Sequence, residues 1–118
     1  MKRDWDLVRK TLLAVEALGD ARGVVESIDG VDSENLSHHL RLLIEAGLMH
    51  GDCSQGLDGP LRCYATSLTW DGHEFLDKIR ADTMWNKVKT IGREKGLTLS
   101  FDVIKAAATY AITEALKR

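Results

Sequence analysis

This 118-residue chain contains little that would mark a linker, a membrane protein or a secreted protein. Proline occurs once, at Pro60, and there is no long run of Ser, Gly or like charges, so we expect no disordered linker. No apolar run approaches the length of a membrane span, and the N-terminus is too acidic and amphipathic for a signal peptide. We therefore expect a cytoplasmic protein with no membrane contact, built as one compact domain or as a small domain with a helical extension.

No charge of one sign dominates, because 16 Lys and Arg stand against 18 Asp and Glu, for a net charge of −2. This balance argues against a strongly basic protein that coats nucleic acid nonspecifically. The charge is uneven along the chain: residues 87–118 hold seven basic and three acidic residues, whereas residues 1–47 hold six basic and nine acidic ones. DNA binding is therefore permitted by the charge and not demonstrated by it.

Residues for metal or catalytic chemistry are few and unsuitably spaced. The two cysteines and four histidines form no C-x-x-C or H-x-x-x-H pattern, and His38 and His39 would point about 100° apart on a helix. The carboxylates are scattered over solvated faces and make no acid–base pair. We therefore expect no metal, no cofactor and no enzymatic activity. The three tryptophans stand beside apolar residues at helix starts, which favours a place in the core over a base-stacking role: Trp5, Trp70 and Trp85.

Periodic apolar residues predict a first helix capped by Asp4 and ended by Gly19, and a second helix over residues 33–46 capped by Asp32 or Ser33. The inward residues of the second helix are Leu36, Leu40, Leu43 and Ile44, and those expected on its outer face are Asn35, Ser37, His38, Arg41 and Glu45. Between the two helices, residues 24–28 resemble a short strand.

Residues 48–53 and 61–69 are expected to be two strands joined by turn residues 54–60. A helix over residues 71–80 follows, and residues 82–95 either restart it or continue it. Ser100 should cap a last helix with these inward residues: Phe101, Ile104, Ala108, Ala111, Ile112 and Ala115.

This order of elements predicts a mainly α fold with a small β-hairpin, namely a winged helix-turn-helix domain with a C-terminal helical extension. Residues 1–82 would be the winged helix-turn-helix domain, and residues 83–118 would pack on it or form a dimer interface. One element has little room: the usual second helix of the motif is either reduced to a turn or lies within residues 20–32.

Several stretches resemble a family of bacterial and prophage proteins catalogued as a domain of unknown function. They are Met1-Lys2-Arg3-Asp4-x-Asp6-Leu7-Val8-Arg9-Lys10, Leu43-Ile44-Glu45-Ala46-Gly47-Leu48, Leu68-Thr69-Trp70-Asp71-Gly72-His73-Glu74-Phe75-Leu76-Asp77-x-Ile79-Arg80 and Trp85-Asn86-Lys87-Val88. The resemblance covers nearly the whole chain and implies a winged-helix regulator from a phage or mobile element. It provides no catalytic residues to transfer.

If residues 33–46 form a recognition helix, its polar side chains suit DNA, since Arg pairs with guanine and Asn with adenine. The DNA-binding candidates are Asn35, Ser37, His38 and Arg41 on the helix, with Gln55 and Arg62 on the wing. An ordinary solvated face is the competing interpretation. Glu34 and Glu45 favour that interpretation on the helix, as do Asp52 and Asp58 on the wing, because carboxylates repel phosphates.

Cys53 and Cys63 are equally distant from Asp58, so a symmetric hairpin would place them opposite each other. A disulfide and a redox switch on the wing are then conceivable. A cytosolic location favours two reduced thiols instead.

Two functions are compatible with these residues and their order. The first is a DNA-binding regulator that dimerises through its N- and C-terminal helices and presents two recognition helices to half-sites about 34 Å apart. The second is a non-catalytic interaction module, such as a phage-encoded modulator of a host protein, which would use the wing or the acidic N-terminal face.

Overall fold

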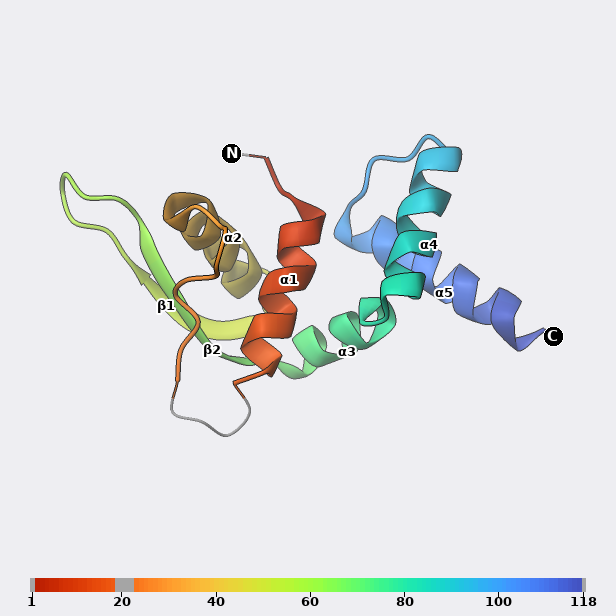
Figure 1. Ribbon diagram of the computed structural model, residues 1–118, viewed down its shortest axis with the longest axis horizontal. Coiled ribbons are helices and arrows are strands. Elements are labelled where there is room, and N and C mark those ends of the chain that lie inside the picture. The colour runs from red at the N-terminus through yellow and green to blue at the C-terminus, as the bar shows by residue number, and fades with distance from the viewer. Residues whose placement is uncertain (1, 19–22, 118) are drawn as a thin grey trace. The chain divides into compact units, whose positions relative to one another are not determined.

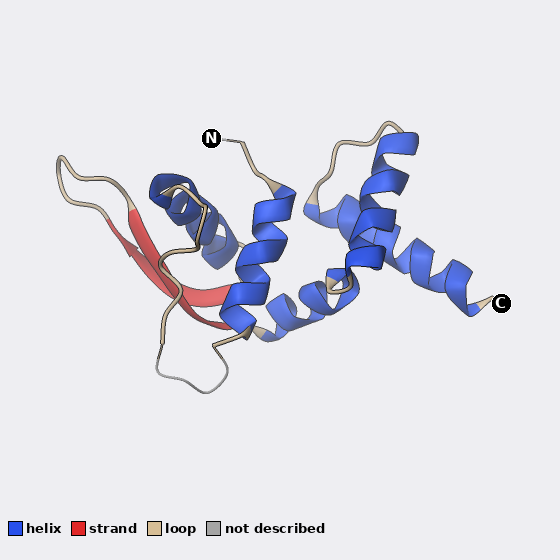
Figure 2. Cartoon of the chain, viewed as in Figure 1, coloured by secondary structure: helices blue, strands red, loops and turns tan. Residues whose placement is uncertain are grey.

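The computed structural model describes residues 2–18 and 23–117 (Figure 1). Its elements are α1 (Trp5–Glu16), α2 (Ser33–Glu45), β1 (Met49–Ser54), β2 (Arg62–Leu68), α3 (Trp70–Ile79), α4 (Asp82–Glu94) and α5 (Phe101–Leu116). The predicted mainly α fold with a small β-hairpin is confirmed (Figure 2). The chain divides into two compact units, residues 1–73 and 74–118, with the division inside α3. The proposed domain boundary after residue 82 lies nine residues further along.

In the first unit, α1 begins where the sequence predicts. The Asp4 carboxylate accepts hydrogen bonds from the backbone N–H groups of Asp6 and Leu7, which would otherwise lack partners in the first turn. The apolar stripe of the helix is buried, and its members are Leu7, Val8, Leu12 and Val15. Gly19, the predicted helix stop, lies outside the described residues.

The second helix, α2, is capped by Asp32, whose carboxylate accepts the Asn35 N–H at 3.0 Å. It ends before Gly47, which has a φ of +78°, a backbone conformation that glycine adopts without steric penalty. The helix packs against both strands and against α1. Its residues Leu36, Leu40 and Leu43 are buried as expected, so the core of this unit lies between α1, α2 and the hairpin.

The two strands pair antiparallel, with Cys53 opposite Cys63 and Met49 opposite Leu68. The register shifts between His50 and Gly51, so that Thr66 is left as the extra residue of a β-bulge. Ahead of α2, the predicted strand is reduced to a single bridge. There Val25 exchanges two backbone hydrogen bonds, of 2.9 and 3.0 Å, with Ala65 of β2.

No helix occurs between α1 and α2 in described residues 23–32. A turn closed by a 3.0 Å hydrogen bond from the Val31 N–H to the Ile28 carbonyl leads into α2. Of the two placements considered for the second helix of a helix-turn-helix, residues 23–32 therefore offer only a turn.

The start of α3 is fastened to the turn that follows α2. The Thr69 hydroxyl donates to the Gly47 carbonyl at 2.6 Å and accepts the Gly72 N–H at 3.0 Å, so one side chain joins the turn to the helix start. A side chain at Gly72 would overlap the Leu48 carbonyl oxygen. The Leu-Thr-x-x-Gly pattern thus has a packing explanation: Thr69 caps the helix, and Gly72 permits the close approach.

In the second unit, α4 and α5 pack against each other, and Phe75 stacks on Phe101 with ring centroids 4.5 Å apart. The Ser100 hydroxyl caps α5 by accepting the Val103 N–H, as predicted. Burial extends only part of the way along α5. Ala108 and Ala111 are buried, whereas Ile112 and Ala115 are exposed, so their predicted inward orientation is wrong. The apolar stripe of α5 therefore continues beyond the residues that α4 covers.

Among the residues that the structure describes, no helix is both long enough and apolar enough to cross a membrane.

Candidate nucleic-acid interface

The outer face of α2 carries three of the predicted DNA-binding residues. Asn35, His38 and Arg41 are each half-buried and follow one another at intervals of three, which places them along the same side of the helix. The exposed carboxylates of Glu34 and Glu45 lie at the two ends of this row. The face therefore offers hydrogen-bond donors in its middle and negative charge at its ends.

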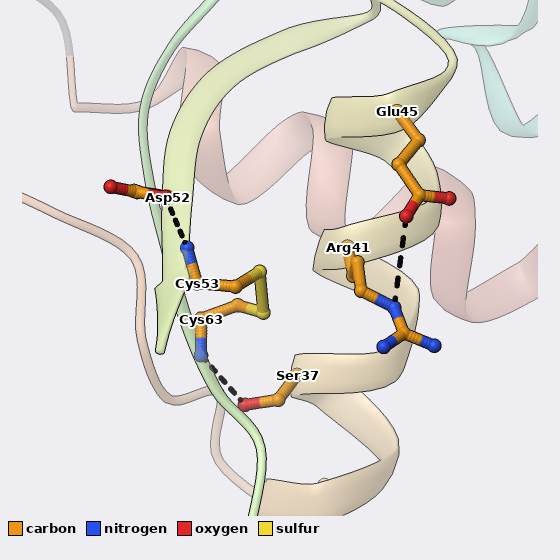
Figure 3. The surroundings of a disulfide bond; sticks show 6 residues. All are labelled: Ser37, Arg41, Glu45, Asp52, Cys53 and Cys63. Atoms are coloured by element: carbon orange, nitrogen blue, oxygen red, sulfur yellow. Dashed lines mark hydrogen bonds and ion pairs between the residues drawn. A yellow bond between two sulfur atoms is a disulfide. The ribbon is translucent and has the colours of Figure 1, made fainter. Parts of the chain in front are cut away.

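Ser37 does not belong to this face, and its predicted outward orientation is wrong. The side chain is only 2% exposed, and its hydroxyl accepts the Cys63 N–H at 3.2 Å (Figure 3). A hydroxyl buried against the hairpin cannot reach a base or a phosphate. Its observed contact instead fixes the position of β2 on α2.

Arg41 is oriented by its own helix. Its Nε is buried and lies 3.9 Å from the Glu45 carboxylate, beyond hydrogen-bonding distance. The side chain as a whole remains 43% exposed. Exposed ion pairs of this kind contribute at most about 1 kcal/mol to stability. Arg41 can therefore exchange Glu45 for a phosphate or a guanine edge at small energetic expense.

The hairpin places Arg62 and Gln55 on the solvent side of the same unit. Arg62 is exposed at the start of β2, and Gln55 is exposed in the loop, where its side-chain amide donates to the Gly59 carbonyl at 3.4 Å. Asp52 is also exposed, but its carboxylate accepts the Cys53 N–H at 2.8 Å. The hairpin thus presents one arginine and one amide, with carboxylates close by in the sequence.

Cys53 and Cys63 form a disulfide, so the interpretation that favoured reduced thiols is wrong. The predicted register is confirmed: the two residues are directly opposed, and their Cα atoms are 4.1 Å apart. Figure 3 shows the sulfur atoms on the side of the hairpin that faces α2, beside Ser37 and Arg41. The bond fastens the base of the loop at the point where the hairpin contacts the helix.

Sequence reasoning missed the structural role of His39, which is fully buried. Its Nε2 accepts the Asp4 N–H at 2.9 Å, and its Nδ1 lies 2.9 Å from the Asn35 carbonyl. Since a carbonyl can only accept, the proton must sit on Nδ1 and the ring is neutral in this arrangement. His39 therefore ties the start of α1 to α2. The sequence signal available was its position one residue before Leu40 on the inward side of the helix.

Trp70 and Leu57 are the most exposed of the large apolar side chains in the described part of the first unit. Trp70 is 79% exposed at the start of α3, so its predicted place in the core is wrong, whereas Trp85 in the second unit is buried as predicted. Leu57 is fully exposed in the hairpin loop. Scattered apolar residues on a surface are ordinary, but an exposed tryptophan is a common anchor in protein interfaces.

Within residues 2–18 and 23–117, no three His, Cys, Asp or Glu side chains lie close enough together to hold a metal ion.

The fold and this surface define a small, mainly helical protein with a two-stranded hairpin fixed to one helix. Residues 2–98 match the family described as "Hypothetical protein (DUF2513)", and the chain belongs to that family. It is also similar to an "Uncharacterized protein" of Haemophilus influenzae, with 45% identity over 118 residues, 98% of this chain and 99% of the relative. No solved structure matches the chain. These comparisons identify the family and carry no activity to this protein.

Proposed function

We propose that the protein is a winged-helix DNA-binding regulator of phage or mobile-element origin, with α2 as the recognition helix and the β1–β2 hairpin as the wing. The observation that carries the proposal is the alignment of Asn35, His38 and Arg41 on the outer side of a helix that is fixed directly to a hairpin. A helix of this size fits the major groove, and these side chains suit base edges and phosphates.

The anchoring of the hairpin also supports the proposal. The Ser37–Cys63 hydrogen bond joins β2 to α2, and the Val25–Ala65 bridge joins β2 to the segment ahead of α2. A rigid arrangement loses little conformational entropy on binding. Net charge near neutrality then implies that binding would rest on a few placed cations, Arg41 and Arg62 among them, rather than on a broad basic surface.

Fluorescence anisotropy with a pool of duplex DNA, including the region upstream of the protein's own gene, tests this proposal at two salt concentrations. We expect salt-sensitive binding that Arg41→Ala weakens by at least about tenfold. Arg62→Ala should lower the slope of log K against log salt by about one, as loss of one phosphate contact does. Arg93→Ala, an equal charge change at an exposed residue of α4, is the matched control and should leave affinity within about twofold.

Equal weakening by all three substitutions would assign the binding to net charge and not to α2. Absence of binding at low salt would remove DNA as the partner.

A protein partner is the second candidate, and the exposure of Trp70 favours it. Glu34 and Glu45 on the outer face of α2 favour it too, because they oppose phosphate binding. In that case the protein would act as a non-catalytic modulator, and Trp70→Ala would abolish capture of the partner while leaving any DNA binding intact. Loss of DNA binding in Trp70→Ala would contradict this second candidate.

A further inference from the structure

The second unit has an apolar stripe that continues past its intramolecular partner. Ala108 and Ala111 of α5 are buried, but the same stripe continues through Ile112 and Leu116, which are 40% and 80% exposed. Tyr110, at 55% exposure, lies on the groove side of α5, about 160° around the helix from Ile112. An amphipathic helix normally keeps such residues covered, so the last turns of α5 carry apolar side chains that no described element of the second unit covers.

Beside this stripe lies a groove of about 660 Å³ between α4 and α5. Its lining residues on α4 are Thr83, Asn86, Lys87, Thr90 and Ile91, and those on α5 are Tyr110, Ala111, Glu114 and Ala115. The small side chains of Ala111 and Ala115 let another helix approach closely, as small residues do in helix–helix contacts. The groove therefore suits a helix carrying larger aliphatic side chains.

We infer that this groove and the end of α5 are a homodimer interface, in which each copy inserts Ile112 and Leu116 against the groove of the other. The second unit carries both parts of the contact, the large side chains of α5 and the groove between α4 and α5. Such self-complementarity is what a two-fold symmetric interface requires, because the same patch is used twice. The inference concerns the second unit alone and stands whether or not the protein binds DNA.

Charge supports a second copy as the occupant. The groove has a cation on its α4 wall, Lys87, and an anion on its α5 wall, Glu114. The α5 helix that would occupy it carries Glu114 and Lys117, which form an ion pair of 3.4 Å. In a reciprocal contact, Lys87 of each copy can meet the Glu114 carboxylate of the other, so both pairs have opposite charge. An acidic or a basic partner would match only one wall.

This interface changes which substitutions are informative. Ala108 and Ala111 of α5 are buried inside the unit, so Arg at either position would disrupt the fold itself. Substitutions at Lys87, Glu114, Ile112 and Leu116 leave the buried core untouched, because none of these side chains belongs to it.

The decisive experiment measures the mass of the full-length chain by sedimentation equilibrium over a wide concentration range. A contact of a few helical turns should dissociate in the micromolar range. The wild-type protein should rise from 13.1 kDa toward twice that mass. Leu116→Glu should remain monomeric, whereas Ala106→Glu, also exposed on α5 but about 15 Å nearer the start of the helix, should associate like the wild type.

A charge exchange then separates the interface from any effect within one chain. Lys87→Glu and Glu114→Lys should each weaken self-association by at least about tenfold, because each variant opposes like charges twice across its own dimer. When the two variants are mixed, both pairs have opposite charge again, and association should return toward the wild-type affinity. An effect confined to one chain cannot be rescued by mixing.

Three results would overturn the inference: a wild-type protein that stays at 13.1 kDa throughout, single variants that associate as the wild type does, or a mixture that remains monomeric. Circular dichroism of each variant confirms that it is folded before its mass is interpreted. None of these readouts involves DNA, so failure here leaves the proposed DNA binding to its own test.

Discussion

Reduction of the Cys53–Cys63 disulfide should lower the free energy of unfolding of the first unit by about 2.7 kcal/mol. The bond closes a loop with a sequence separation of 10 residues. In the chain-entropy treatment, closing a loop of that length removes about 9 cal/mol/K from the unfolded state, which gives the stated value at 25 °C. The folded hairpin has no need of the bond for its register, since its ladder and the Ser37–Cys63 hydrogen bond remain after reduction.

The assay is urea unfolding of the oxidised protein and of the same protein in dithiothreitol, where the midpoint should fall by about 1–3 M. Amide hydrogen exchange, read separately for each unit, locates the effect. Protection should fall in β1 and β2 and stay unchanged in α5, which belongs to the other unit. A variant with Cys53→Ser and Cys63→Ala should show no response to dithiothreitol, which controls for the reductant.

Two outcomes would refute this reasoning. Thiol titration of protein purified without reductant could find two free thiols, which would show that the opposed cysteines do not pair. Alternatively, oxidised and reduced proteins could unfold at the same urea concentration, which would show that the loop is already constrained in the unfolded chain.

Two further substitutions test contacts of the first unit. His39→Ala should lower the free energy of unfolding by about 2–3 kcal/mol, because it leaves the Asp4 N–H without its acceptor. The control, His50→Ala at an exposed position, should change it by less than about 0.5 kcal/mol. Similar urea midpoints for the two variants would contradict the role of His39. Gly72→Ala should lower the free energy of unfolding of the first unit by about 3 kcal/mol, because the new side chain would overlap the Leu48 carbonyl. Gly56→Ala, in the open loop, has no such overlap and is the control. Thermal unfolding of the two variants decides whether packing or helix propensity is the reason for glycine at position 72.

The two cysteines show which features of the hairpin can be predicted from the sequence and which cannot. Their equal distance from Asp58 predicts the hairpin register, because turn residues and spacing act locally, and the structure confirms the pairing of Cys53 with Cys63. Whether opposed cysteines form a bond was inferred from the compartment rather than from the chain, and that inference was wrong. Local geometry was available from the sequence, and the chemistry between the two thiols was not.

The predicted orientations of Ser37 and Ile112 are wrong for a different reason. Both lie at the edge of a helix face, where periodicity cannot say whether another element covers the side chain. The hairpin covers Ser37, and no element of the described second unit covers Ile112. Helical periodicity therefore indicated the apolar stripes correctly and could not indicate where each stripe stops being covered. The DNA-contacting role of Asn35, His38 and Arg41 stays a prediction.

The bulge at Thr66 has a consequence for how this hairpin can change in length. Along β2, Cys63 and Ala65 are buried and so is Leu68, three positions later, because the extra residue resets the alternation of faces. Removal of Thr66 would leave Ala65, Ser67 and Leu68 opposite the same partners and facing the same sides, in a regular ladder. Loss of Tyr64 would instead turn Ala65 outward and bring Thr66 opposite Gly51. An evolutionary deletion in β2 is therefore expected to be accepted at the bulge and selected against at Tyr64.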